Sequence, residues 1–177
     1  MSKGSTVLPG FRRFLVKPLE IILIAGMAAM TIDVLWGVFS RYVLGGQTRW
    51  TEELAIYLLI WISLLGASLT YGERGHLGVD YFVGKLDAKA QVLAAVFVEL
   101  FVLLFAGFAL VYGGWILVSK TLAAGQVAPT LGWQMGYVYL AAPVSGVFFF
   151  LFAIEHLLRL RTGADVRFRP EEPPHAE

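Results

Sequence analysis

The segment Trp50-Thr51-Glu52-Glu53 leads directly into LAIYLLIWISLLGASLTYG, residues 54–72, which carries no charged side chain. The polar segment ERGHLGVD, residues 73–80, follows at once. A helix needs about 20 predominantly apolar residues to cross about 30 Å of hydrocarbon, and residues 53–72 meet that length. The pattern therefore predicts a membrane-spanning helix with charged residues at both ends. Thr51 is its expected N-cap, which places Glu52 and Glu53 in the first turn, where the helix dipole favours carboxylates.

Further apolar runs show that the whole chain is suited to a membrane. Of its 177 residues, 58% are hydrophobic and only 15% are charged, and the mean hydropathy is +0.70. Backbone groups in lipid must be satisfied within their own segment, so each run predicts a helix. We expect an all-α integral membrane protein with a single four-helix domain over residues 1–161 and a flexible tail over 162–177. The predicted spans are about 19–40, 53–72, 90–118 and 136–158.

The lysines and arginines predict the orientation of these spans. Four of them precede the first span, three lie in the middle loop and four follow the last span, whereas three lie on the other side. Cytoplasmic segments of membrane proteins carry an excess of basic residues, so both termini and the middle loop are expected in the cytoplasm. Within that loop, apolar residues recur between positions 77 and 86 at helical spacing. A short helix lying in the interface and an ordinary loop touching lipid explain this spacing equally well.

Asp33 and Glu99 are ionisable residues placed deep within the predicted spans. A charge at the bilayer centre costs about 3 kcal/mol or more, so each residue prompts a functional hypothesis. At 1.5 Å per residue they lie about 20 and 15 Å from the cytoplasmic side, so they could lie near one another inside a bundle. They could form a proton or cation relay. Alternatively, each could hydrogen-bond a neighbouring helix of this or another subunit, or be protonated, and Asp33 could be linked to Arg41 on the same helix face. The structural role is favoured, because two carboxylates form no substrate-binding constellation.

Several chemical classes are excluded by the residues present. The absence of cysteine rules out disulfides, thiolate metal sites and iron–sulfur clusters. The histidines, at 76, 156 and 175, fall in a loop, near a helix end and in the tail, so two of them are not expected to face one another across a haem. Neither a metal-ligand cluster nor a nucleophile with a paired base is apparent. We therefore expect no catalytic residue, no metal, no cofactor and no nucleic-acid partner. Small residues at four-residue spacing, such as Gly66 with Thr70 and Ala109 with Gly113, favour close helix packing.

An ordered set of residues covers positions 41–86. It consists of Arg41-Tyr42, Trp50-Thr51-Glu52-Glu53-Leu54, Trp61, Gly66-Ala67, Arg74-Gly75-His76-Leu77-Gly78-Val79-Asp80 and Leu86. On a chain with four predicted spans, this set resembles the DctQ-like small permease subunit of the tripartite ATP-independent periplasmic (TRAP) transporters. The second half of the chain agrees in hydropathy only. Asp87 departs from the pattern, because the family often has proline after the preceding leucine.

The resemblance implies an accessory role in a secondary transporter of a bacterial or archaeal cytoplasmic membrane. In such systems a periplasmic binding protein delivers an organic anion, often a carboxylate, to a large multispan permease subunit. The large subunit is expected to hold the substrate and sodium sites, and the small subunit is expected to pack against it and stabilise it. Residues at the helix ends are the candidates for contact with the large subunit. They are Arg41, Trp50, Glu52 and Glu53 on the outer side, and Arg74, His76 and Asp80 on the inner side.

Two alternatives remain open at the level of the sequence. Each candidate residue could instead cap a helix or anchor it in the interface within this chain alone. The chain could also be an autonomous, homo-oligomeric ion or drug transporter that uses Asp33 or Glu99. A cytochrome-like electron-transfer subunit is not favoured, because the histidines are poorly placed for haem.

Overall fold

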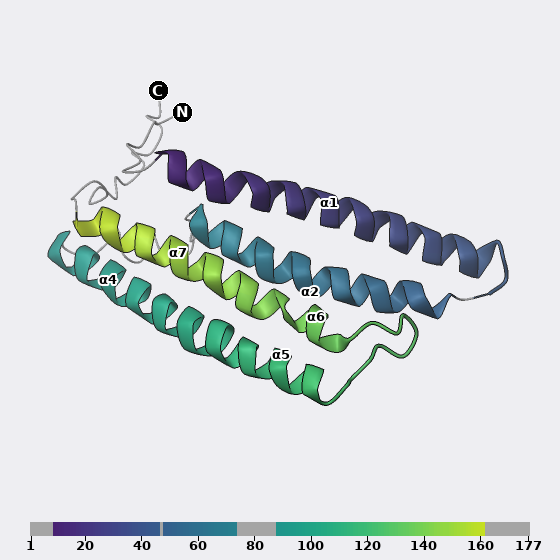
Figure 1. Ribbon diagram of the computed structural model, residues 1–177. Coiled ribbons are helices and arrows are strands. Elements are labelled where there is room, and N and C mark those ends of the chain that lie inside the picture. Colours follow the sequence, from purple (N-terminus) through teal and green to yellow (C-terminus); the bar gives the residue numbers. More distant parts are fainter. Residues whose placement is uncertain (1–8, 47, 74–87, 162–177) are drawn as a thin grey trace, which may run out of the picture.

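The computed structural model describes residues 9–46, 48–73 and 88–161, which form a long helical array (Figure 1). Four stretches are long and apolar enough to cross a membrane, namely Leu15–Tyr42, Arg49–Gly72, Leu93–Ala123 and Met135–Leu158. The predicted all-α fold with four spanning helices is thereby confirmed. The elements are α1 (Pro9–Tyr42), α2 (Arg49–Gly72), α4 (Ala88–Phe105), η1 (Ala106–Gly113), α5 (Gly114–Ala123), α6 (Met135–Tyr139) and α7 (Ala141–Arg161).

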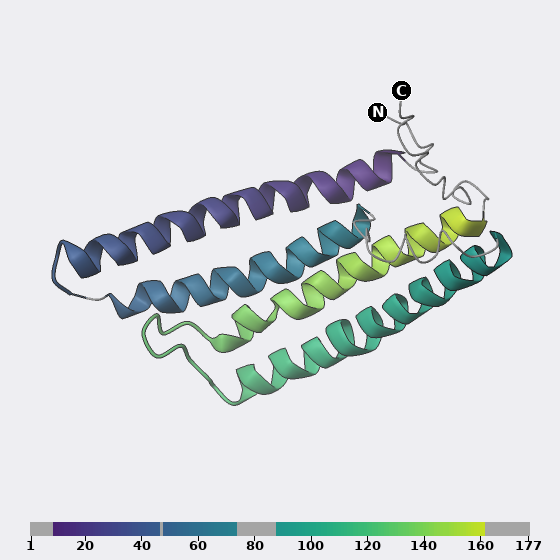
Figure 2. The same cartoon turned by 180° about the vertical axis from the view of Figure 1, so that it is seen from behind.

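The helices lie side by side in the order α1, α2, α7 and then the third span, which runs through α4, η1 and α5 (Figures 1 and 2). The main packing partner of α1 is α2, whereas α2 also packs against α7, and α7 packs against α4 and η1. In the most apolar part of each span, 6% of the residues are buried in the first and third spans, against 22% in the second and 39% in the fourth. The two spans at the edges of the row therefore keep most of their apolar surface for lipid or for another protein.

Two hydrophobic clusters hold the row together, one toward each end. The connection from α1 to α2 and the connection from α5 to α6 lie at one end, which we call the loop end (Figure 1). The cluster near the loop end contains Tyr57, Ala128 and Val138. The cluster toward the opposite end contains Leu19, Leu65, Tyr71, Phe152 and Ala153. The buried residues of these clusters thus come from α1, α2, α6, α7 and the α5–α6 connection.

The second helix begins earlier than the sequence predicted. Its N-cap is Thr48, with an extended backbone at φ −82° and ψ 105°, and the helix starts at Arg49. The prediction that Thr51 is the N-cap was therefore wrong, because nothing at Arg49 or Trp50 stops the helix from extending toward its N-terminus. The Thr51 hydroxyl instead donates a hydrogen bond to the Thr48 carbonyl oxygen at 2.7 Å. Glu52 remains in the first turn, whereas Glu53 lies one residue beyond it.

The third span contains a π-helical segment, η1, that packs closely on α7. An added Cβ atom at Gly146 of α7 would lie 2.7 Å from Cβ of Leu110 and 3.1 Å from the backbone nitrogen of Val111. A Cβ atom at Gly114 would similarly lie 2.9 Å from the Pro143 ring. Glycine at these two positions allows the third and fourth spans to approach with backbone almost in contact.

Candidate functional site

Three side chains from three different helices meet toward the end of the row opposite the loops. The hydroxyl of Tyr71, on α2, donates a hydrogen bond to Oε2 of Glu99, on α4. Nδ1 of His156, on α7, lies 3.1 Å from Oε1 of the same carboxyl group. The Tyr71 and His156 rings are in contact, with centroids 5.2 Å apart. We call this group the Tyr–Glu–His cluster; it gives each Glu99 oxygen a partner on another helix.

Burial makes the Tyr–Glu–His cluster a structural connection. The His156 side chain is 3% exposed and the Glu99 side chain is 14% exposed. Polar groups at such depth are costly unless they are hydrogen-bonded, and here each satisfies another. The cluster therefore links α4, at the edge of the row, to both central helices. The structural role that the sequence favoured for Glu99 agrees with these contacts.

At the loop end, Glu53 binds the connection between α5 and α6. Its Oε2 atom accepts hydrogen bonds from the backbone nitrogens of Thr130 at 3.0 Å and Leu131 at 2.8 Å. The hydroxyl of Tyr57 donates to its Oε1 atom at 2.9 Å, and Sδ of Met135 lies 3.1 Å from that hydroxyl. Glu53 thus fixes the connection within its own chain, which is the intrachain alternative left open by the sequence.

The connection bound by Glu53 is itself folded as a tight hairpin-like turn. Val127 and Gln134 form an isolated antiparallel bridge, and the Ala128 nitrogen donates to the Trp133 carbonyl oxygen at 2.7 Å. Gly132 has a φ of 68°, a backbone conformation that favours glycine. The Thr130 and Leu131 backbone nitrogens point out of this turn toward Glu53. The Glu53 carboxylate therefore accepts the hydrogen bonds that these two nitrogens do not make within the turn.

Removal of the Glu53 carboxylate is expected to loosen this turn without unfolding the spans. In Glu53→Ala, the amide protons of Thr130 and Leu131 should exchange with solvent about tenfold faster, because they lose their acceptor. Glu53→Gln is the matched control, because its side-chain carbonyl still accepts and its amide group can donate to the Tyr57 oxygen. Hydrogen exchange followed by mass spectrometry measures the difference. Equal exchange in the Ala variant and in the parent protein would contradict this role of Glu53.

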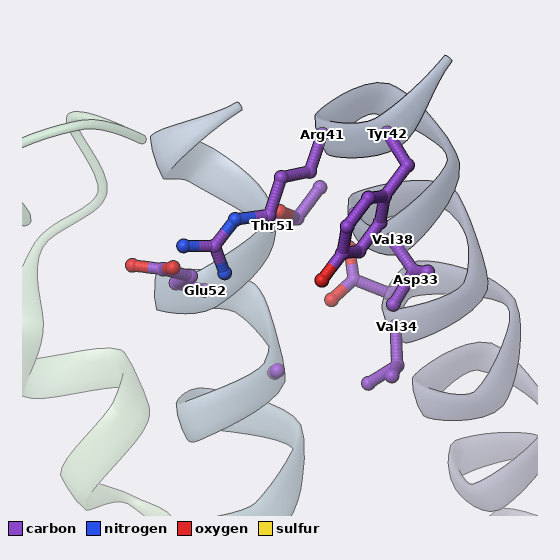
Figure 3. A pocket seen from close by; sticks show the side chains of 9 residues that line it. Asp33, Val34, Val38, Arg41, Tyr42, Thr51 and Glu52 are labelled. Atoms are coloured by element: carbon purple, nitrogen blue, oxygen red, sulfur yellow. The ribbon is translucent and has the colours of Figure 1, made fainter. Parts of the chain in front are cut away.

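A pocket of about 280 Å³ lies between α1 and α2 near the loop end (Figure 3). Asp33 lies on its α1 wall and is 5% exposed, and its two carboxyl oxygens accept no hydrogen bond from the residues that the structure describes. The Arg41 side chain is directed toward Glu52 on α2 (Figure 3). Asp33 and Arg41 therefore line the same pocket, but Arg41 is not directed toward Asp33. Its lining is Asp33, Val34, Gly37, Val38, Arg41, Tyr42, Thr51, Glu52 and Ala55.

The remaining candidates are only partly brought together. Asp33 faces Thr51 near the start of α2, whereas Glu99 contacts Tyr71 near its end, which is about 30 Å along the helix axis. Asp33 and Glu99, which by their depth could have lain near one another, are therefore far apart. Trp50, 38% exposed, lies in the first turn of α2. Arg74, His76 and Asp80, and the suggested interfacial helix at 77–86, lie outside the described residues, as does the tail at 162–177.

The sequence did not indicate that Tyr71 and His156 would hold Glu99. Position 156 is predicted near a helix end and Tyr71 is the second-last residue of its apolar run, so neither position indicates a contact with Glu99. The third span extends beyond the level at which Tyr71 and His156 lie. Glu99 therefore lies beside these two residues, although it is well inside its own span. In the described ranges 9–46, 48–73 and 88–161, no group of three histidine, aspartate or glutamate side chains is arranged to hold a metal ion.

The four spans and their internal polar contacts define a small, multi-pass integral membrane protein. Comparison with known families identifies it more closely: residues 30–163 match the family described as tripartite ATP-independent periplasmic transporters, DctQ component. The chain belongs to this family of TRAP transporter small permease subunits. It is therefore a component of a transporter and not an enzyme.

Individual relatives agree with this assignment. A Haemophilus influenzae protein assigned to the TRAP transporter small permeases is 33% identical over 134 residues, which cover 76% of this chain and 81% of the relative. The sialic acid TRAP transporter small permease protein SiaQ of Vibrio cholerae is 28% identical over 80% of each chain. The isethionate TRAP transporter permease protein DctMQ of Oleidesulfovibrio alaskensis is 28% identical over 70% of this chain but only 20% of its own length. Small permeases of this family thus work with a large permease.

Proposed function

We propose that this chain packs against the large permease subunit of a TRAP transporter and stabilises it during cation-coupled uptake of an organic anion. A periplasmic binding protein would deliver the anion, and the large subunit would hold the sodium and substrate sites. The relative named DctMQ supports a close association, because this chain aligns with one fifth of a much longer permease. The relatives named for sialic acid and isethionate support an organic anion as the substrate class.

The distribution of polar and apolar groups carries the proposal. The Tyr–Glu–His cluster and the Glu53 contacts satisfy polar groups within the chain. The edge spans instead present large apolar side chains outward, among them Leu35 of α1 and Phe101 and Phe108 of the third span, each at least 63% exposed. Such a subunit is suited to adhere to another membrane protein and to resist movement. If the large subunit carries its substrate across the bilayer, a neighbour of this kind would anchor its stationary part.

The proposed location is the cytoplasmic membrane of a prokaryote, with the loop end on the periplasmic side. The excess of basic residues at the termini and in the middle loop supports this orientation. Arg41, Trp50, Glu52 and Glu53 would then lie at the periplasmic surface, where Trp50 is suited to the lipid interface. Glu53 would act there through the α5–α6 connection, and Arg41 and Glu52 would line the neighbouring pocket.

Reconstitution with and without the large permease tests the proposed function. The two subunits should copurify, and proteoliposomes containing both should take up the anion when the binding protein and a sodium gradient are supplied. Sialic acid and isethionate, radiolabelled, are the first anions to test. Liposomes with this chain alone should show background flux only, because the substrate and sodium sites are assigned to the other subunit. Anion or cation flux through this chain alone, lost in Asp33→Asn or Glu99→Gln, would contradict the proposal and favour an autonomous transporter.

A further inference from the structure

The pocket between α1 and α2 contains an excess of acidic side chains. Two carboxyl groups, those of Asp33 and Glu52, line it together with a single guanidinium group, that of Arg41 (Figure 3). Arg41 points toward Glu52 (Figure 3), whereas Asp33 lies eight residues earlier on α1, about 12 Å further from the loop end. Arg41 is the only basic residue among those that line the pocket, so the part around Asp33 is acidic.

Asp33 is the residue of this pocket whose buried carboxyl group needs a hydrogen-bond or charge partner. It is 95% buried by the chain, yet no described residue donates a hydrogen bond to either of its carboxyl oxygens. It lies nine residues, about 13 Å, before the end of the 28-residue span Leu15–Tyr42. That span is about 42 Å long and exceeds the hydrocarbon thickness of about 30 Å by about 6 Å at each end, so Asp33 lies inside the hydrocarbon region. A carboxyl group at that depth is costly unless it is paired, and intramembrane acids are usually paired inside an assembly.

The position of Asp33 selects among the partners that could supply the missing group. The amine of a lipid headgroup lies in the interface, so it would have to enter the hydrocarbon region to reach Asp33. A bare metal ion would find one buried carboxylate and a nearby guanidinium, which repels it. A lysine or arginine side chain from a neighbouring membrane helix can reach such a depth, because its long apolar stem lies along the helices while its charged end enters the pocket.

The α1 wall of the pocket is suited to such a helix. Val34, Val38 and Tyr42 line the pocket and are 48%, 51% and 80% exposed. Gly37, on the same wall, brings α1 close to α2, since a Cβ atom there would lie 3.1 Å from the Thr51 hydroxyl oxygen. An incoming helix would therefore cover apolar side chains of α1 while its cation enters between α1 and α2.

We propose that the Asp33 pocket receives a lysine or arginine side chain from a membrane helix of the large permease subunit. The inference rests on the proposed function, because it names a contact within that assembly. The charge pair would fix the depth and rotation of the two subunits relative to each other, since only one register brings the cation to Asp33.

The decisive test uses Asp33→Leu, because the expected effects on the chain alone and on the complex have opposite signs. In the purified full-length chain, this variant should be at least as resistant to unfolding as the parent, because it removes a buried carboxyl group without a partner. In the complex, the amount of large subunit retained after a detergent wash should fall at least about tenfold, because the cation is left unpaired. Thr31→Val is the matched control, because among the described residues the Thr31 hydroxyl bonds only to the Met27 carbonyl of its own helix, at 2.8 Å.

Cross-linking identifies the partner group. The chain has no cysteine, so a single cysteine introduced at Val34, on the pocket wall, can be cross-linked to cysteines placed along the helices of the large subunit. The cross-linked helix should carry a lysine or arginine at the depth of Asp33, and changing that residue to aspartate should restore assembly of Asp33→Lys.

Three results would overturn the inference. They are destabilisation of the isolated chain by Asp33→Leu, full retention of the large subunit by that variant, and a cross-linked helix without a basic residue. If the parent chain itself fails to copurify with the large subunit, the proposed function fails instead, so the two failures are distinguishable.

Discussion

Gly146→Ala is expected to lower the free energy of unfolding by about 2 kcal/mol, and Gly146→Leu by more, because both overpack the contact between the third and fourth spans. The added Cβ atom would lie 2.7 Å from Cβ of Leu110, 3.0 Å from Cγ2 of Val111 and 3.1 Å from the backbone nitrogen of Val111. Two of these three atoms belong to the backbone or are attached directly to it. A change of side-chain rotamer cannot relieve the clash, so the spans themselves must move apart.

The π-helical backbone of η1 increases this effect. Leu110 and Val111 both lie within it, and its wider turns bring them toward α7, where only glycine leaves enough space. Separation of the two spans would also disturb the nearby contact of Gly114 with Pro143. The loss of stability should therefore be cooperative along the interface.

Gly66→Ala provides the matched control for Gly146→Ala. Gly66 also lies inside a spanning helix, but the nearest atom to its added Cβ would be Cδ2 of Leu23 at 3.9 Å, an ordinary contact. The variant should be neutral or more stable by up to about 1 kcal/mol, because alanine is the better helix former. Unfolding in mixed micelles measures both variants. Equal stabilities of Gly146→Ala and Gly66→Ala would show that the close approach at η1 does not contribute.

The sequence predicted the number of spans because hydropathy and length act locally, one helix at a time. It did not predict where the spans would touch most closely. The four-residue spacing favours packing at Gly66 with Thr70 and at Ala109 with Gly113, yet the tightest positions include Gly136 and Gly146. Small residues recur at four-residue spacing throughout this apolar chain, so spacing alone does not distinguish an interhelical contact from a position facing lipid.

The polar contacts were predicted only in part, for a related reason. The depth of Glu99 in its span indicated that it needs a partner, but the identity of that partner depends on how far α4 slides along α7. For Glu53, an early place in its helix suggested a contribution from the helix dipole. Its stronger contacts are with Thr130 and Leu131, more than 70 residues away. Because the residues in contact are far apart in the sequence, both sites form only when the helices pack together.

Removing one member of the Tyr–Glu–His cluster is expected to be among the most destabilising single changes in this chain. Glu99→Leu and His156→Leu should each lower the free energy of unfolding by about 3 kcal/mol, because each leaves a buried polar group without its main partner. Glu99 is the more critical of the two, since its loss removes both the Tyr71 and the His156 contacts. The edge span containing α4 would then lose its hydrogen bonds to Tyr71 of α2 and His156 of α7.

A double-mutant cycle separates this pairing from simple loss of packing. The double variant Glu99→Leu with His156→Leu should be less destabilised than the sum of the two single variants, because neither polar group remains unpaired. Tyr71→Phe is the conservative control; it removes one hydroxyl, keeps the ring contact with His156, and should cost about 1 kcal/mol. The measurement is again unfolding in mixed micelles. Strict additivity of Glu99→Leu and His156→Leu would mean that the carboxyl and imidazole groups do not stabilise one another, and that the three helices are held in register by shape alone.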